Sequence, residues 1–224
     1  MSAKSPDGKP IDVAENRRRM ENGEYYYAFT PDLLKDRKRC TIAMKKFNRT
    51  DHPTRREMIT MWNDIVGDTS ALPEQKPVEE EDDAQLEDYP WVEAPVRMDF
   101  GYNIKLGKNV FINANSTWID TCTITIGDRV MFGPGVSLYS GGHPVDYRVR
   151  NGISGPEFGG KITIGEDCWI GGNVIILPGI TIGRGTTIGA GSVVTKDIPE
   201  ECVAVGNPCR VIKKIDTSKP PMTI

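Results

Sequence analysis

The chain has 224 residues, and 28 lysines and arginines against 31 aspartates and glutamates give it a net charge of −3. This balance provides no global positive field, so we do not expect a nucleic-acid partner. The sequence also lacks an apolar run of about 18 residues and an apolar leader near its N-terminus, so we expect no membrane partner and a cytoplasmic location.

Cysteine and histidine are too few for most metal centres. The five cysteines include no C-x-x-C pair, which argues against a disulfide framework and a structural zinc site, and we expect free thiols. The only histidines are His52 and His143, so one chain supplies at most two imidazole ligands. We therefore expect no metal cofactor.

The first part of the chain predicts a small helical domain. Residues 1–12 are rich in Ser, Pro, Gly and Lys and are expected to be flexible. Over residues 13–70 apolar residues recur at helical spacing, which predicts two or three short helices. Thr30 before Pro31 indicates a helix start, and Thr54 with Glu57 predicts a capping box for a helix over 55–66. The expected inward residues are Met20, Tyr25, Leu33, Leu34, Ile42, Met44, Phe47, Met58, Met61, Trp62 and Ile65.

Residues 71–94 predict an acidic linker or exposed loop. Five consecutive acids occupy positions 79–83, and such a run is expected to stay outside any core.

Beyond Pro95 the sequence repeats every six residues. Apolar residues stand six apart at Ile164, Ile170, Ile176, Ile182, Ile188 and Val194, and upstream at Leu106, Ile112 and Trp118 and again at Ile126, Phe132 and Leu138. With 38% hydrophobic residues, six preset apolar positions have a chance of about 0.003. Glycines follow four of the inward residues, at 165, 171, 183 and 189, and we attribute them to corner backbone angles that a Cβ would obstruct.

A period of six fits neither a helix nor a simple strand, but it fits a coil with three flat sides. Each side is then a short parallel strand. The sequence therefore predicts a mainly β fold, with a parallel β-helix over 95–205, an inserted loop at about 139–163 and a C-terminal segment over 206–224.

Motifs along nearly the whole chain resemble those of one enzyme family. In chain order they are MENGEYYYAFTPDLLKDRKRC, GYNIKLGKNVFINANSTWID, GGHPVD, WIGGNVIILPGITIG, IGAGSVVTKDIP and GNPCRVIKKI. Together they are similar to the hexapeptide-repeat sugar O-acetyltransferases, the family of the bacterial maltose and galactoside acetyltransferases. The resemblance implies a left-handed β-helix with a small α-helical cap domain at 13–70. It also implies acetyl-CoA as acetyl donor, a sugar or glycoside hydroxyl as acceptor, and a homotrimer with active sites between subunits.

The resemblance implies two catalytic residues. His143 lies in the inserted loop before Pro144, and loops held by a rigid scaffold often carry function. The family pattern makes His143 the general base of a direct transfer within a ternary complex. Asn113 matches the family asparagine that supports the tetrahedral intermediate, and Asn115 is the alternative as a coil-corner residue.

Acceptor and donor residues are implied in the same way. On the acceptor side they are Asp99, Glu157 and Arg37, with Asp120 near them. Tyr27 and Ala28 stand where relatives place a carboxylate, which leaves the sugar open. For coenzyme A they are Trp169, Gly172, Ala190, Thr195, Lys196, Arg210 and Lys213.

Two other functions fit a β-helix of this kind. A γ-type carbonic anhydrase needs three histidine ligands for zinc, which two histidines cannot supply. A catalytically silent assembly or interaction module is the alternative, since a fold alone does not guarantee activity.

Overall fold

Three helices form the cap at the N-terminal end of the chain. The computed structural model describes residues 8–218, so residues 1–7 of the predicted flexible segment 1–12 and the terminal residues 219–224 lie outside the described part. The helices are α1 (Val13–Glu21), α2 (Pro31–Arg49) and α3 (Arg55–Val66). The predicted capping box is confirmed, because Thr54 accepts the Glu57 N–H and Glu57 accepts the Thr54 N–H. The helix predicted to start at Thr30 and Pro31 is longer than expected, with 19 residues.

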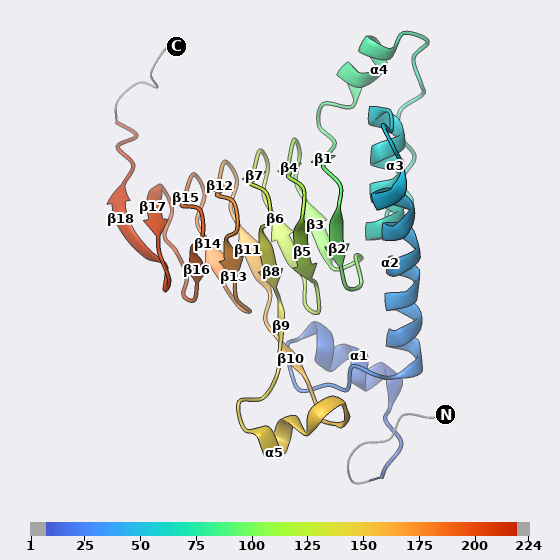
Figure 1. Cartoon of the computed structure of the whole chain (residues 1–224), viewed down its shortest axis with the longest axis vertical. Coiled ribbons are helices and arrows are strands. Elements are labelled where there is room, and N and C mark those ends of the chain that lie inside the picture. The colour runs from blue at the N-terminus through green and yellow to red at the C-terminus, as the bar shows by residue number, and fades with distance from the viewer. Residues whose placement is uncertain (1–7, 219–224) are drawn as a thin grey trace.

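Helix α2 runs beside α3 and the first coils (Figure 1) and buries a single stripe, most of it in the core shared with them and its first residue in a second cluster with α1 and the α1–α2 loop. The stripe consists of Leu33, Cys40, Met44 and Phe47, at helical spacing. Leu34 and Ile42 fall outside this stripe and are exposed, as is Tyr25 in the α1–α2 loop. The prediction that these three residues point inward was wrong.

The acidic segment contains a helix, α4 (Glu79–Gln85), where we predicted a linker or exposed loop. Its Asp82 is only 5% exposed. Arg56 makes this burial possible, because its Nε and Nη2 donate to the two Asp82 carboxylate oxygens at 2.7 and 2.8 Å. The expectation that all five acids stay outside the packed structure is therefore corrected for one of them.

The β-helix winds through three parallel sheets. Sheet A contains β1 (Trp91–Val92), β4 (Phe111–Ile112), β7 (Met131–Phe132), β12 (Trp169–Ile170), β15 (Thr187–Ile188) and β17 (Cys202–Val205), and ends in the antiparallel β18 (Arg210–Lys214). Sheet B contains β2 (Val96–Met98), β5 (Ser116–Ile119), β8 (Ser137–Tyr139), β13 (Ile175–Ile176) and β16 (Val193–Val194). Sheet C contains β3 (Ile104–Leu106), β6 (Ile124–Ile126), β11 (Ile162–Ile164) and β14 (Thr181–Ile182).

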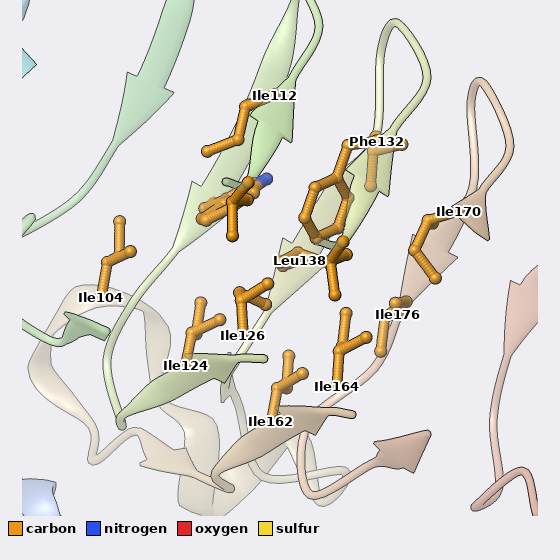
Figure 2. Close-up of a cluster of buried hydrophobic side chains, with 14 of the residues drawn as sticks. Ile104, Ile112, Ile124, Ile126, Phe132, Leu138, Ile162, Ile164, Ile170 and Ile176 are labelled. Atoms are coloured by element: carbon orange, nitrogen blue, oxygen red, sulfur yellow. The ribbon is translucent and has the colours of Figure 1, made fainter. Parts of the chain in front are cut away.

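This architecture is the predicted fold class, with the first strand slightly upstream of the expected start at 95. The column from Ile164 to Val194 is buried throughout, and Figure 2 shows much of it converging inside the coil. A second buried column, which we did not predict, precedes each of these residues by two positions: Ile162, Cys168, Val174, Ile180, Thr186 and Ser192. Each side of the coil thus points two residues inward, two positions apart, because side chains alternate along extended backbone.

The repeat glycines are explained by close packing between coils. A Cβ at Gly165 would lie 2.5 Å from the Arg184 nitrogen of the next coil, and one at Gly171 would lie 2.6 Å from the Ala190 nitrogen. Their φ angles are not positive, so our explanation by corner angles was wrong. The positive φ values occur two residues later, for example at Asp167 and Asn173.

The inserted loop predicted at about 139–163 forms an arm that projects from the coil (Figure 1). It contains β9 (Gly141–Gly142), the short α5 (Tyr147–Arg150), a 3₁₀ turn η1 (Gly152–Ser154) and β10 (Phe158–Gly159). Strands β9 and β10 pair antiparallel, with Gly142 opposite Phe158. Across residues 8–218, no helix is long and apolar enough to cross a membrane.

Candidate active site

Two edges of the three-sided coil carry many of the residues predicted for the site. We call the corners that follow the sheet A strands the AB edge, and those that follow the sheet B strands the BC edge. Asn113, Gly172 and Ala190 lie on the AB edge, one or two residues after β4, β12 and β15. Asp99, Asp120 and Thr195 lie on the BC edge, directly after β2, β5 and β16. The strands of sheet B separate the two edges.

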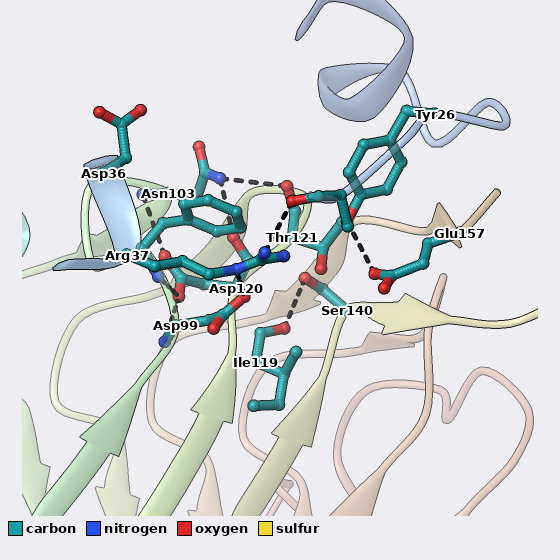
Figure 3. Close-up of polar contacts among 12 residues, drawn as sticks. Tyr26, Asp36, Arg37, Asp99, Asn103, Ile119, Asp120, Thr121, Ser140 and Glu157 are labelled. Atoms are coloured by element: carbon teal, nitrogen blue, oxygen red, sulfur yellow. Dashed lines mark hydrogen bonds and ion pairs between the residues drawn. The ribbon is translucent and has the colours of Figure 1, made fainter. Parts of the chain in front are cut away.

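Arg37 of α2 connects the cap to the BC edge. Its Nε donates to Asp99 Oδ2 at 2.9 Å, and its Nη1 donates to the Ala28 carbonyl at 2.7 Å. The guanidinium carbon also lies 4.8 Å from the centroid of the Phe100 ring, in a cation–π contact. The side chains of Arg37 and Asp99 are 20% and 26% exposed, so the pair is accessible to a ligand but held in place (Figure 3).

Asp120 lies beneath this pair and has no exposed surface. Its Oδ1 accepts the backbone N–H groups of Asp99 at 3.0 Å and of Phe100 at 2.8 Å, and its Oδ2 accepts that of Asn103 at 3.3 Å. Burial raises the pKa of the Asp120 carboxyl to about 7, against the lowering effect of the Phe100 N–H. The predicted contact of Asp120 with the acceptor is therefore corrected: Asp120 supports the loop that presents Asp99.

Glu157 lies at the base of the arm, directly before β10, where the cap meets it. The loop between α1 and α2 runs alongside, and Tyr26 and Glu157 exchange backbone hydrogen bonds at 3.0 and 2.9 Å. Gly23 of the same loop approaches Gly159 so closely that a Cβ there would lie 2.5 Å from the Gly159 carbonyl oxygen. The arm is thus fastened between the coil and the cap. The sequence did not point to Tyr26, because its partner is 131 positions away.

His143 lies on the exposed side of the arm, one residue beyond β9. Continuing the β9–β10 register by one position sets His143 opposite Glu157. Directly opposed residues of an antiparallel pair carry their side chains to the same face. Continued in this way, the register would place the predicted base and a predicted acceptor residue at the same part of the BC edge.

Asn113 lies away from these residues, on the AB edge. Its side-chain oxygen accepts the Ala114 N–H at 2.8 Å, which leaves the amide nitrogen as a donor. Asn115 has a φ of 65° at the corner, which fits the structural role we gave as its alternative. The whole strand β5 separates Asn113 from Asp120, a distance on the order of 15 Å. One chain therefore does not bring Asn113 to His143.

Trp169 and Lys213 occupy one outward-facing row of sheet A. The register pairs Trp169 with Thr187, Thr187 with Val203, and Val203 with Lys213. Three strand spacings of about 4.8 Å separate the indole from the lysine. Arg210 begins the same last strand, β18, whereas Lys196 lies with Thr195 on the BC edge. The structure therefore divides the predicted coenzyme A residues between the two edges and sheet A.

The same row continues in the other direction as an apolar ladder, which sequence reasoning missed. Phe111 pairs with Trp91 and with Met131, and Met131 pairs with Trp169. Trp91, Met131 and Trp169 are 48%, 53% and 57% exposed. An apolar row with three exposed members is typical of a surface that contacts a ligand or a partner. Its sequence signal is a large apolar residue directly before the inward one, as in Phe111–Ile112.

Over the part of the chain that the structure describes, no group of three or more His, Cys, Asp or Glu side chains could hold a metal ion. All five cysteines are free, as predicted, and all five are buried.

Three family profiles match the chain. Residues 19–69 match the maltose acetyltransferase hexapeptide capping motif, residues 103–140 the hexapeptide repeat of succinyl-transferase, and residues 161–196 the bacterial transferase hexapeptide (six repeats).

Several relatives match this chain over nearly their whole length. A putative acetyltransferase of Schizosaccharomyces pombe is 38% identical over 203 residues, which cover 89% of this chain and 91% of that protein. The crystal structure of a maltose O-acetyltransferase from Clostridium difficile 630 has a TM-score of 0.77 and 43% identity, covering 90% of this chain and 97% of that one. A galactoside acetyltransferase in complex with coenzyme A has a TM-score of 0.76 and 34% identity, with 93% of both chains covered. The chain is therefore an acyltransferase that belongs to the galactoside and maltose O-acetyltransferase family.

Proposed function

We propose that this protein transfers the acetyl group of acetyl-CoA to a hydroxyl of a sugar or glycoside, directly within a ternary complex. The main support is the polar cluster at the BC edge, where Arg37, Asp99 and Glu157 surround the base of the arm that carries His143. Carboxylates and a guanidinium suit the several hydroxyl groups of a sugar, which both donate and accept hydrogen bonds.

His143 acts as the general base. The neutral imidazole takes the proton of the acceptor hydroxyl while the oxygen of that hydroxyl attacks the thioester carbonyl carbon. When the tetrahedral intermediate collapses, the carbon–sulfur bond breaks, and the protonated His143 returns its proton to the departing thiolate. The exposure of His143 on the arm leaves its ring accessible to both substrates.

Asn113 stabilises the intermediate from a second subunit. Its free amide nitrogen donates to the oxyanion that develops on the carbonyl oxygen. Since Asn113 and His143 lie on different edges of one chain, a complete site needs the AB edge of one copy beside the BC edge of another. Cyclic symmetry with three copies closes such an arrangement around a three-sided prism. We therefore propose a homotrimer with its active sites between subunits.

In this proposal acetyl-CoA extends along sheet A and the AB edge. Gly172 and Ala190 permit close approach of the pantetheine arm, Trp169 offers an exposed ring, and Arg210 and Lys213 suit the phosphates. Thr195 and Lys196 would contact the donor from the BC edge of the neighbouring copy. The related galactoside acetyltransferase structure in complex with coenzyme A supports the choice of ligand.

The test is thiol release from acetyl-CoA across a panel of glucosides, galactosides, maltose and simple alcohols. Release that depends on a sugar supports the proposal. Absence of release with every acceptor, together with absence of coenzyme A binding, would favour the silent assembly module instead. Light scattering gives the assembly state, and a mass near one subunit would refute the shared site.

A further inference from the structure

Tyr26 is the residue that holds the Glu157 carboxylate. The Tyr26 side chain is fully buried, and its hydroxyl donates to Glu157 Oε2 at 3.0 Å. Figure 3 shows the phenol reaching from the cap loop to the carboxylate on the arm. The ring cannot contact a ligand, so Tyr26 can act only through the groups that its hydroxyl meets, Glu157 and Thr121, and Glu157 is the charged one.

The contact is built so that Tyr26 always donates. Burial raises the pKa of the Tyr26 hydroxyl well above its usual range, and the negative charge of Glu157 raises it further. The hydroxyl therefore keeps its proton at any working pH. Glu157 Oε1 accepts no hydrogen bond from residues 8–218, and the residue is only half-buried. One carboxylate oxygen is thus fixed, and the other is left for a ligand.

The backbone already fastens the arm without this hydroxyl. Tyr26 and Glu157 exchange two main-chain hydrogen bonds, and Gly159 donates to the Gly23 carbonyl at 3.4 Å. The hydroxyl fixes the orientation of the Glu157 side chain, which would otherwise rotate about its three side-chain bonds. Loss of the hydroxyl alone should therefore change the orientation of the Glu157 carboxylate and leave the arm in place.

We propose that Tyr26 is a positioning residue for the acceptor, which aims Glu157 Oε1 at a sugar hydroxyl other than the one that is acetylated. This inference rests on the proposed function. It assigns part of the acceptor specificity to a buried cap residue that never touches the sugar.

The experiment compares Tyr26→Phe with wild type, using methyl glucoside and ethanol as acceptors at saturating acetyl-CoA. Phenylalanine preserves the buried ring. We expect the KM for methyl glucoside to rise about 5- to 50-fold, the effect of one charge-assisted hydrogen bond, with kcat nearly unchanged. Ethanol has no second hydroxyl for Glu157, so its kcat/KM should stay at the wild-type value. A merely structural role would impair both acceptors alike.

Tyr25→Phe is the matched control, because Tyr25 is adjacent, 54% exposed, and forms a T-shaped ring pair with Phe158 of the arm that phenylalanine would keep. It should behave as wild type. Adding Tyr26→Phe to Glu157→Ala should raise the methyl glucoside KM no further, since the partner is already gone. Equal KM values in wild type and Tyr26→Phe, or additive effects in the double variant, would overturn the positioning role. Those results would leave acetyl transfer itself intact, whereas full activity of His143→Ala would refute the proposed mechanism and not the role of Tyr26.

Discussion

The carboxylate of Asp120 lies directly under Asp99 and accepts its backbone N–H at 3.0 Å, so a buried acid supports a partly exposed one. The exposed acid is in turn paired with Arg37 of the cap. Helix α2 of the cap, the corner after β2 and the corner after β5 thus meet in one series of contacts. Because Asp120 is buried, its ionisation affects the stability of the whole junction.

Replacement of Asp120 by Asn should change how stability depends on pH. The folded-state pKa of about 7 exceeds the ordinary value of 3.8, so the folded protein retains a proton that the unfolded chain has released. Wild type should therefore lose stability relative to Asp120→Asn as pH rises through this interval, by about 4 kcal/mol in total at about 1.4 kcal/mol per pKa unit. Urea unfolding of both proteins at several pH values measures the difference.

Asp51→Asn is a suitable control for this series, because the Asp51 side chain is 92% exposed at the α2–α3 turn. Its difference from wild type should stay flat with pH. A flat difference for Asp120→Asn as well would mean that the three backbone donors outweigh burial and keep Asp120 ionised.

His143→Ala should lose acetyl transfer while the protein stays folded and assembled. Removal of a general base lowers kcat by about 10²- to 10⁴-fold. His143 lies on the arm and outside the buried columns, so the coil core is untouched. His52→Ala is the control, since its side chain is 95% exposed in the cap turn, and it should retain full activity. Loss of assembly together with activity would show that His143 has a structural role.

Truncation of a side chain in the buried column should lower the free energy of unfolding far more than truncation of one on the cap surface. Ile176 is 0% exposed at the centre of the coil, whereas Ile42 is 60% exposed on α2. Ile176→Ala should lower the free energy of unfolding by about 2 to 5 kcal/mol, through lost burial and a residual cavity. Ile42→Ala should change it by less than about 1 kcal/mol. Denaturant unfolding measures both, and equal effects would contradict the assigned orientation of the repeat.

Much of the coil could be predicted because each rung repeats the same local rule. Ile176 and its six-residue neighbours are determined by spacing alone, and the Thr54–Glu57 box by a four-residue motif. The second inward column escaped prediction because it mixes isoleucine with Cys168, Thr186 and Ser192, which hides the period. In the narrow coil these smaller side chains hydrogen-bond to nearby backbone carbonyls, as Ser192 does to Gly189 and Thr186 to Pro199.

The candidate site was less predictable, because its contacts join distant segments. The burial of Asp120 depends on the fold of the loop at 99–103, and the choice of Tyr26 over Tyr25 as the buried ring depends on the arm. No local sequence pattern shows that Asp120 is buried, or that Tyr26 is buried and Tyr25 is not. The positions of His143 and Glu157 on the arm came from the family motifs, and their shared edge came only from the β9–β10 register.

The buried acid of α4 should matter more than its exposed neighbour. Arg56 holds the pKa of Asp82 well below its ordinary range by donating to its carboxylate. A lowered pKa contributes stability above the unfolded value of 3.8, and this contribution is lost as pH falls below it. Asp82→Asn should therefore lower the unfolding free energy at neutral pH, and the deficit should shrink in acid. Asp83→Asn, at an exposed position, should match wild type at both pH values in the same unfolding assay.

Lys213→Ala should weaken coenzyme A binding more than Lys214→Ala. Lys213 pairs with Val203 and lies in the outward row that contains Trp169, whereas Lys214 pairs with the inward-facing Cys202. Both lysines are exposed, so each variant loses one positive charge, and the two variants differ only in the position of that charge. Since an exposed cation contributes little to a single ion pair, we expect a roughly 5-fold rise in the dissociation constant for Lys213→Ala. Calorimetric titration at low and high salt measures it, and the wild-type advantage should fall as salt screens the phosphates. Equal weakening by the two variants would mean that general positive charge attracts the donor and that the row on sheet A does not bind its phosphates.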